Sequence, residues 1–465
     1  NAEEVPGNGK DDDNNGYVDD IHGWNFIGGS DGRDINYENL EVVRLYSKLK
    51  KKYANRNREG LPKAEKKEYD KIAEYEKEIK ENQEKWAPQL AQVKPLFEMA
   101  EMAMKTIGKE PADITKEDID NLDDTEFGLF KNVAGRFLAE TDFAGFYDEI
   151  KGYVEYMESQ VEYNYNPDFD ARDIVGDDPS NLDDRNYGNN NYEGPDAAHG
   201  THVAGIIAAI RDNGIGVDGV GGANVRIMSV RTVPNGDERD KDVANAIRYA
   251  VDNGASVINM SFGKGYSPYK GAVDDAVRYA EKNDVLLVHA AGNDGKELTL
   301  TNNYPNDIYL KRGFLRPKGS RVWLEVGAST SDFGEGLPAG FSNYNTEYVD
   351  VFAPGRDIYS TVPESEYSSF NGTSMAAPMV AGIAALLRSY FPDLTARQVR
   401  EIIIESALPA SLSVVKPGTE SDKVDFNRLS ATGALANAYA AVKLAETTKG
   451  KKKRTAERDA SLKMY

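Results

Sequence analysis

The spacing of apolar residues between positions 36 and 160 is that of amphipathic helices. Ile72, Tyr75, Ile79 and Trp86 follow helical spacing, and Glu and Lys dominate around them while glycine is sparse. The residues expected to form the core of packed helices are Met99, Met102, Met104, Phe127, Phe130, Phe137 and Phe146. We therefore predict a helical insertion over residues 36–160. Its default role is structural, and a lid or a partner-binding surface is the alternative, because no ligand motif occurs in it.

The pattern changes from about residue 196 onward, where short apolar runs alternate with segments of helix length. The runs expected to form strands are 225–230, 257–260 and 285–288, and the expected helices are 203–210, 241–253 and 272–283. Strands that alternate with helices are typical of an α/β domain with a parallel sheet. In such a domain the functional site lies outside the carboxyl ends of the strands.

Residues 371–387 join a short polar turn to a helix that is apolar on nearly every face. Such a helix should be buried, and Gly372 allows a tight turn before it. Because a proline is tolerated in a first helical turn, Pro378 is expected there. Ser374 should then lie at the helix N-terminus, where free N–H groups and the helix dipole favour an oxyanion. A serine so placed suits acyl transfer, and an ordinary N-cap serine is the alternative.

Composition narrows the classes of function. A length of 465 residues is enough for more than one domain, and we predict four segments. They are an N-terminal part at 1–35, the insertion at 36–160, the main domain at 161–445 and a basic tail at 446–465. The net charge of −21 argues against nucleic acid and anionic membranes as partners and favours divalent cations. The absence of cysteine excludes disulfides and a cysteine nucleophile, and no apolar run is long enough to predict a membrane span. The tail is expected to be solvated and partly disordered.

The segment from Asp11 to Asp20 places Asp or Asn at alternate positions ahead of a glycine. This is the beginning of an EF-hand-type calcium loop, in which several oxygens of one short loop reach one point. The expected ligands are Asp11, Asp13, Asn15, the Tyr17 carbonyl and then Asp19 or Asp20. His22 stands at the twelfth position, where the motif has a bidentate Glu, so the match is partial. We predict a structural calcium ion here, with a plain acidic turn as the alternative.

The chain has four histidines, and one of them is placed as a catalytic base should be. His199 stands between a polar loop and an apolar helix, with Gly200 beside it for access, and is the expected general base for Ser374. His202 lies within the helix and His289 closes a buried strand, so both are expected to be structural. A metal pair of His199 and His202 is the weaker alternative, because no third ligand is evident.

Two turns follow predicted strands directly and should reach the same edge of the sheet. Residues 261–263 follow the strand at 257–260, and residues 291–293 follow the strand that begins at 285. The side-chain amide of Asn293 at such a strand end can donate to a developing oxyanion. Read alone, Asn293 and the two residues after it are also an ordinary turn.

Taken in this order, these segments resemble the subtilisin-like serine proteases, the subtilase family. The matching segments are 199–205, 259–263, 291–293, 351–355 and 372–378. The resemblance covers about residues 196–445 and the opening loop, and it does not cover the helical insertion. It implies an α/β, subtilisin-like three-layer fold with a mainly parallel central sheet, to which the helical subdomain is added.

The resemblance also implies a serine endopeptidase with Ser374 as nucleophile, His199 as general base and acid, and Asn293 in the oxyanion hole with the Ser374 backbone N–H. The residues implied to pair with the substrate backbone and to line the pocket for the residue before the scissile bond are Ser261, Phe262, Gly263, Ala291 and Gly292. Polypeptides are the implied substrates, with a propeptide or an inhibitor as a further candidate partner. A secreted or cell-surface location follows from the resemblance alone, since the chain does not start with a signal peptide.

One feature of the family is missing from the sequence. Its chain order is Asp, His, Ser, yet no Asp-Ser-Gly or Asp-Thr-Gly turn precedes His199. Asp31 lacks the preceding strand and the small hydroxyl residue, so we expect the catalytic aspartate upstream of Asn1. Without that carboxylate the histidine takes the wrong tautomer, and the isolated chain should be nearly inactive. The alternatives are a catalytically dead peptide-binding pseudoprotease and a non-proteolytic acyl hydrolase that uses Ser374.

Overall fold

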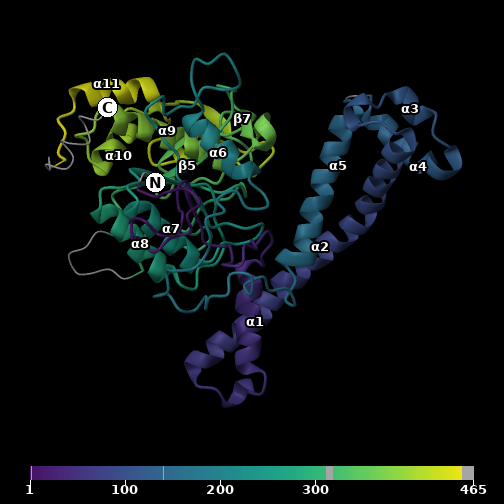
Figure 1. Cartoon of the computed structure of the whole chain (residues 1–465), viewed down its shortest axis with the longest axis horizontal. Coiled ribbons are helices and arrows are strands. Elements are labelled where there is room, and N and C mark those ends of the chain that lie inside the picture. Colours follow the sequence, from purple (N-terminus) through teal and green to yellow (C-terminus); the bar gives the residue numbers. More distant parts are fainter. Residues whose placement is uncertain (2, 140, 311–317, 453–465) are drawn as a thin grey trace. The chain divides into compact units, whose positions relative to one another are not determined.

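The computed structural model describes residues 1, 3–139, 141–310 and 318–452, and the chain divides into two compact units (Figure 1). The first unit combines residues 1–36 with the chain from Arg172 onward, and the second unit is formed by residues 37–171. The second unit therefore extends past the insertion predicted at 36–160. The extension arises because Asn164 returns to the start of the insertion, where its side chain donates to the Glu38 carbonyl and its own carbonyl accepts from the Leu40 N–H, both at 3.0 Å.

In the described residues of the second unit, all regular elements are helical. The unit contains α1 (Glu41–Tyr53), α2 (Lys63–Ile107), α3 (Lys116–Asp120), α4 (Asp124–Phe137), α5 (Phe143–Glu158) and a π-helical turn at Ser159–Asn164. Helix α2 packs along both α1 and α5. Phe127, Phe130 and Phe146 are buried as predicted, whereas Phe137 and Met102 are 44% and 38% exposed. Phe137 ends α4, where its ring contacts one side of Phe146 and faces solvent on the other.

The first unit is built around a six-stranded sheet, as the alternation of strands and helices predicted. Its strands are, in spatial order, β3 (Val257–Met260), β4 (Leu286–Ala290), β5 (Trp323–Ser329), β6 (Val351–Pro354), β12 (Ala434–Leu435) and β9 (Leu408–Pro409). All neighbouring pairs are parallel except β12 with β9. The two-stranded sheets are β1 (Gly23–Asn25) with β2 (Ser229–Arg231), β7 (Ile358–Val362) with β8 (Glu366–Phe370), and β10 (Ser413–Val415) with β11 (Lys423–Asp425).

Helices cover both faces of this sheet and complete three layers (Figure 1). They are α6 (Ala198–Ala208), α7 (Asp240–Asp252), α8 (Lys270–Lys282), α9 (Thr373–Tyr390), α10 (Ala396–Glu405) and α11 (Ala438–Thr447). Successive residues of a strand point to opposite faces. Accordingly, Leu286 and Val288 pack in one core with α9, α10 and α11, while Leu287 packs in another with α7 and α8.

The apolar run 225–230, predicted as a buried strand, becomes regular only at its end. Ile227 is 44% exposed, and the three residues of β2 are half-buried. In the described part of the chain, β2 pairs with β1 along one edge and β3 pairs with β4 along one edge. A strand that is paired on one side only leaves its other edge open. The predicted strand was therefore too long. The run 225–230 would be buried along its length only if a second strand paired with the open edge.

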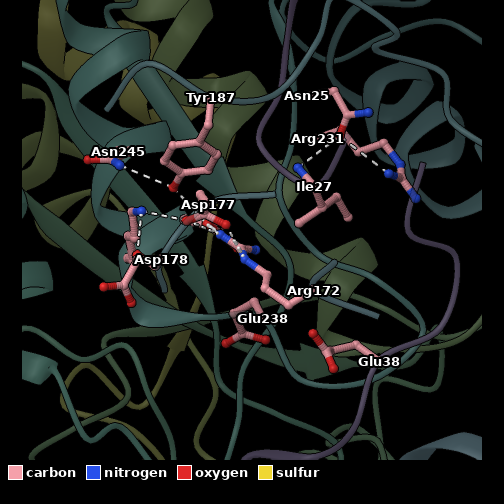
Figure 2. A network of polar contacts seen from close by, with 12 residues as sticks. Asn25, Ile27, Glu38, Arg172, Asp177, Asp178, Tyr187, Arg231, Glu238 and Asn245 are labelled. Carbon is pink, nitrogen blue, oxygen red and sulfur yellow. Dashed lines mark hydrogen bonds and ion pairs between the residues drawn. The ribbon is translucent and has the colours of Figure 1, made fainter. Parts of the chain in front are cut away.

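Buried ion pairs hold the connection that begins at Arg172 against α7 (Figure 2). The Arg172 guanidinium lies 2.8 Å from the Asp242 carboxylate and 2.6 Å from that of Asp177, which also pairs with Lys241. The Tyr187 hydroxyl donates to Asp242 at 2.7 Å. Lys241 also lies 3.2 Å from the partly exposed carboxylate of Asp184. Two cations therefore face three carboxylates, and these pairings offset the desolvation of the buried charges. This network fixes the segment that leads to α6.

The beginning of the basic tail is also fixed. The Lys452 ammonium lies 3.2 Å from Asp284, and its backbone N–H donates to the Asp393 carbonyl at 3.0 Å. Lys449 and Lys451 are exposed, as predicted for a solvated tail, but the described beginning of the tail is held in place by these contacts. Lys453 and Arg454 lie outside the described residues. In the part of the chain that the structure describes, no helix has both the length and the apolar character needed to cross a bilayer.

Candidate active site

Ser374 is the second residue of α9, so its predicted place at a helix N-terminus is confirmed. The preceding Gly372 is held by a hydrogen bond from its N–H to the Gly355 carbonyl, just after β6. A Cβ atom on Gly372 would lie 3.3 Å from the side-chain nitrogen of Asn293 and 3.5 Å from the backbone nitrogen of Ser374. These two donors thus border the same small space, and glycine leaves that space open.

The sequence predicted Pro378 in the first turn of α9, but Pro378 lies in the second turn. It has no N–H to donate to the Ser374 carbonyl four residues earlier. The Ser261 hydroxyl takes that role, because it donates to the Ser374 carbonyl at 2.8 Å. The Asn259 amide in turn donates to the Ser261 hydroxyl oxygen at 2.9 Å and so orients it. A side chain from the end of β3 thereby compensates for the proline.

The structure brings Ser374 to the end of β3 but does not join it to His199 by a hydrogen bond. The Ser374 hydroxyl donates to the Ser261 carbonyl at 3.3 Å. His199 is the second residue of α6, a helix that packs against α9, and its side chain reaches solvent. Among the described residues, no hydrogen-bond partner holds its ring. Ser374, the predicted nucleophile, is thus held at the start of α9, whereas no hydrogen bond among the described residues fixes the ring of His199, its predicted base.

The surroundings of His199 favour the neutral imidazole that a general base needs. Although the ring reaches solvent, desolvation by the protein around it lowers its pKa, and Coulombic repulsion from His202 acts in the same direction. The Asp196 carboxylate opposes both effects. The net pKa lies below the ordinary histidine value, so the ring is neutral at pH 7.

Asn293 is locked in one orientation by the residue before the nucleophile. Its side-chain oxygen accepts from the backbone N–H and from the hydroxyl of Thr373, both at 2.8 Å. The same hydroxyl accepts from the Gly292 N–H at 3.1 Å. With its oxygen so engaged, the Asn293 amide presents its N–H₂ group as donor. The role of Thr373 was not predicted, and the only signal in the sequence was a hydroxyl residue next to Ser374.

The two predicted substrate-binding turns leave the sheet side by side. Met260 and His289 are register partners on β3 and β4, so residues 261–263 and 291–292 emerge at the same edge. Asn303 lies between them and is 8% exposed. Its amide donates to the Ala291 carbonyl at 3.1 Å, and its oxygen would lie 2.5 Å from a Cβ on Gly263. Sequence reasoning missed Asn303, because nothing in its loop marks it as a neighbour of either turn.

His202 and His289 have the structural roles that were predicted. The Nε2 atom of His202 lies 2.9 Å from the Ile358 carbonyl and 3.1 Å from the Ser368 carbonyl, and its ring stacks on Phe370. The Nδ1 atom of His289 lies 3.0 Å from the Glu325 carboxylate. Both rings are fully buried.

The structure separates the acidic residues of the opening loop into two groups. The Asp11 carboxylate accepts from the N–H groups of Asn15 and Gly16, and the Asp19 carboxylate accepts from those of Asn8 and Gly9. Asp11 and Asp19 therefore shape the loop. Asp13 instead lies with two other carboxylates, those of Glu4 and Asp20, and Asn15 donates to it at 3.1 Å. The Tyr17 ring is buried against Trp24 and Tyr249.

Comparison with known proteins gives a consistent result. Residues 122–448 match the model of the Subtilase family. The chain is 39% identical over 255 residues to the Thermophilic serine proteinase of Bacillus sp. (strain AK1), which covers 54% of this chain and 55% of that protein. It is 40% identical over 213 residues to Subtilisin DY of Bacillus licheniformis, covering 45% of this chain and 70% of that protein.

A third similar protein is the Cell wall-associated protease of Bacillus subtilis (strain 168), 35% identical over 255 residues, with coverage of 55% of this chain and 26% of that protein. The chain thus spans about half the length of the thermophilic proteinase and about a quarter of the cell wall-associated protease. Among solved structures, the protease domain of PatA is 29% identical with a TM-score of 0.42, over 55% of this chain and 82% of that one.

Proposed function

This chain belongs to the subtilase family, and we propose that it is part of a serine endopeptidase that cleaves peptide bonds through an acyl-enzyme on Ser374. The observation that carries the proposal is the locked amide of Asn293. Its N–H₂ group and the Ser374 N–H border one space at the start of α9, next to the nucleophile. Two fixed donors around one point are what a developing oxyanion requires.

In the proposed reaction the Ser374 oxygen attacks the scissile carbonyl while His199 accepts the hydroxyl proton. The oxyanion is held by Asn293 and the Ser374 N–H. When the C–N bond breaks, His199 gives that proton to the leaving amine, and water then hydrolyses the ester by the same route in reverse. The Ser374 hydroxyl must leave the Ser261 carbonyl for this reaction, and that bond is long enough, at 3.3 Å, to be exchanged readily.

The proposed substrate is an extended polypeptide that pairs with residues 261–263 as an added strand. Phe262 is half-buried and Gly263 is exposed at the end of β3, so backbone groups there are accessible. The side chain before the scissile bond would enter between this turn and Ala291 with Gly292, above Asn303. Because the Asn303 side chain forms the floor of this pocket, we propose that small side chains are preferred directly before the scissile bond.

The carboxylate that orients His199 is proposed to come from a strand upstream of Asn1. Two features support this proposal. In the described residues, β2 and β3 each have one edge that pairs with no other strand. Helix α7 contacts β2 and also shares a hydrophobic core with β3, so the two open edges lie near the same helix. Val257 and Ile258 are only half-buried, as expected for a strand that lacks one neighbour. A parallel strand in this place would present its carboxyl end at the edge where Ser261 and Ser374 meet.

Labelling with a fluorophosphonate, which reacts with activated serines, tests both parts of the proposal. We expect slow labelling of this chain, fast labelling of a chain extended upstream to include the aspartate, and none of the Ser374→Ala variant of either. Fast labelling of this chain alone would contradict the missing carboxylate. No labelling of the extended chain would contradict the endopeptidase and favour the peptide-binding pseudoprotease. The observation that supports this alternative is that no described residue forms a hydrogen bond with the His199 ring.

Two further proposals accompany the enzyme. The acidic loop binds a structural calcium ion, a proposal supported by the convergence of carboxylate oxygens from Glu4, Asp13 and Asp20. The protein is secreted or lies at the cell surface, in line with the name of the similar Cell wall-associated protease of Bacillus subtilis (strain 168). Fractionation of cells that express the complete gene, with an antibody against this chain, tests the location: signal in the medium or the wall fraction supports it, and signal confined to the cytoplasm contradicts it.

A further inference from the structure

Opposite charges stand at the two ends of the longest helix of the second unit. Residues 48–71, the basic lobe, hold ten Lys or Arg and four Asp or Glu, which gives a net charge of +6. Residues 109–126, the acidic lobe, hold eight Asp or Glu and two Lys, which gives a net charge of −6. The two lobes lie at opposite ends of α2 (Figure 1). Because the whole chain carries a net charge of −21, a basic lobe of this size requires a specific reason.

The fold of the unit uses only part of this positive charge. Three ion pairs within the basic lobe connect the end of α1 and the loop after it to α2: Lys52 with Glu68, Arg56 with Glu65, and Arg58 with Asp70. Lys51, Lys63 and Lys67 are exposed, and they form no ion pair with any other described residue. Lys63 and Lys67 also lie in the first two turns of α2, where the positive end of the helix dipole disfavours cations. Helix stability therefore does not account for them.

The acidic lobe likewise keeps negative charge that the unit does not pair. Asp118 and Asp124 each pair with a lysine of the same unit. Glu117, Asp120 and Glu126 are exposed, and none of them forms an ion pair among the described residues. Helix α2 has 45 residues and separates the lobes by up to about 67 Å, whereas salt screens charges that are more than about 8–10 Å apart. The two lobes of one chain therefore do not neutralise each other.

Exposed aromatic side chains gather near the middle of α2, between the two lobes. Tyr153 and Tyr156 on α5 are each 49% exposed, and their spacing of three residues places them on one face of that helix. The Tyr156 ring contacts the Trp86 ring edge to face, with 5.4 Å between the centroids. Trp86 is one residue from the centre of α2. Aromatic side chains that are part exposed and part packed are enriched at protein interfaces, so this aromatic patch indicates a protein partner.

We propose that the second unit binds a second copy of itself, with the two α2 helices antiparallel. A two-fold axis then passes through the aromatic patch, which contacts the same patch of the other copy. The basic lobe of each copy faces the acidic lobe of the other, so the charges of +6 and −6 meet at both ends. A contact as long as α2 and about 10–12 Å wide covers roughly 700–800 Å² on each copy, close to the roughly 800 Å² of specific interfaces.

An anionic polymer is the other partner that a basic lobe attracts. Two features favour the second copy. The acidic lobe matches the basic lobe in size of charge, and the aromatic patch lies at the point where an antiparallel pair has its axis. A polymer would use neither the acidic lobe nor the patch. Self-association does not require the chemistry of Ser374, so its test can fail while the endopeptidase proposal stands, and the reverse also holds.

Sedimentation equilibrium of the full chain measures self-association directly. We expect a monomer–dimer equilibrium whose dissociation constant rises at least about tenfold between about 0.05 M and about 0.5 M NaCl, because salt screens the paired lobes. Tyr156→Ser removes a ring at the two-fold axis and should raise the dissociation constant by about tenfold or more. The matched control is Tyr439→Ser, since Tyr439 lies in the first unit and is 75% exposed. The control should change the dissociation constant by less than about threefold.

Charge reversal tests which surfaces meet. The first variant reverses three lysines of the basic lobe: Lys51→Glu, Lys63→Glu and Lys67→Glu. The second variant reverses three carboxylates of the acidic lobe: Glu117→Lys, Asp120→Lys and Glu126→Lys. Each set brings its lobe to a net charge of zero, so each variant should bind itself about tenfold or more weakly than the wild type does. In a mixture, the unchanged acidic lobe of the first variant pairs with the unchanged basic lobe of the second, and the mixed dimer should be tighter than either self-dimer.

Far-ultraviolet circular dichroism confirms that each variant keeps its helices. The proposal is overturned if the wild-type chain stays monomeric at about 100 μM in low salt. It is also overturned if the mixture of the two variants associates no more tightly than each variant alone, because the lobes then do not meet. Binding of sodium polyphosphate by a monomeric wild-type chain, lost when the three lysines are reversed, would identify an anionic polymer as the partner in place of a second copy.

Discussion

Ser261 and Ser374 exchange hydrogen bonds: the Ser261 hydroxyl donates to the Ser374 carbonyl at 2.8 Å, and the Ser374 hydroxyl donates to the Ser261 carbonyl at 3.3 Å. The first bond exists because Pro378 leaves the Ser374 carbonyl without its helical donor. The end of β3 and the start of α9 are thereby held together at the point where the proposed chemistry takes place. This bond is an energetic link between the proposed substrate-binding turn and the proposed nucleophile.

The Ser261→Ala variant should be less stable than the wild type by about 1–2 kcal/mol, because it leaves the partly buried Ser374 carbonyl without its donor. Pro378→Ala supplies the missing N–H, so the loss caused by Ser261→Ala should be smaller in the Pro378→Ala background by roughly 1 kcal/mol. Urea unfolding of the wild type, the two single variants and the double variant measures this coupling. Additive effects of the two substitutions would show that the Ser261 hydroxyl does not replace the helical donor.

Thr373 is predicted to act on catalysis through Asn293. In the full-length enzyme, Thr373→Val removes the hydroxyl that fixes the Asn293 amide while keeping the shape of the side chain. The turnover number should fall about 10- to 100-fold with little change in KM, against about 100- to 1000-fold for Asn293→Ala. The double variant with Thr373→Val and Asn293→Ala should be no slower than Asn293→Ala alone, since both substitutions remove the same interaction. Thr373→Ser keeps the hydroxyl and should restore most of the turnover; equal losses in the Ser and Val variants would indicate a packing role.

Much of the first unit could be predicted because its signals are local. The strands at 257–260 and 285–288 and the turn before Ser374 each depend on residues adjacent in sequence, and each was found where expected. The position of Pro378 was misjudged because its missing hydrogen bond is replaced by Ser261, more than a hundred residues away. No local rule indicates such a donor.

The same limit explains what was missed at the sites. Asn303 and Glu4 stand in segments without a motif, and only the folded chain places Asn303 under Gly263 and Glu4 beside Asp13. The short extent of β2 has a related cause. The run 225–230 has the composition of a buried strand, but burial requires a neighbour on each edge, and the described residues supply one.

Substitution of Asn303 is predicted to change the side chain accepted before the scissile bond. In the full-length enzyme, Asn303→Ser should raise kcat/KM for peptides with Phe at this position, relative to Ala, by about tenfold or more, because each methylene of pocket space is worth roughly 1–3 kcal/mol. Asn302→Ser is the matched control, since Asn302 is exposed and bonds within its own loop. A wild-type preference for Phe, or an unchanged Phe-to-Ala ratio in Asn303→Ser, would show that Asn303 does not form the floor.

Asp307 is predicted to make the stability of the protein depend on pH. Burial raises the pKa of its carboxyl to about 7, and the nearby carboxylates of Asp350 and Glu325 act in the same direction. Between the unfolded value of 3.8 and about 7, the folded chain therefore binds more protons at this residue than the unfolded chain does. The contribution of Asp307 to the free energy of unfolding must fall as pH rises through this window.

Asp307→Asn replaces the carboxyl by a neutral group of the same shape and removes this dependence. At pH 8 the variant should be more stable than the wild type by roughly 2–4 kcal/mol, since each pKa unit is worth about 1.4 kcal/mol, and the two should converge near pH 4. Urea unfolding at intervals from pH 4 to pH 8 measures the difference, with Asp173→Asn as the control because that side chain is 76% exposed. If the difference between wild type and Asp307→Asn is constant across this range, Asp307 titrates in the folded protein as it does in the unfolded chain, and its burial among carboxylates has no energetic effect.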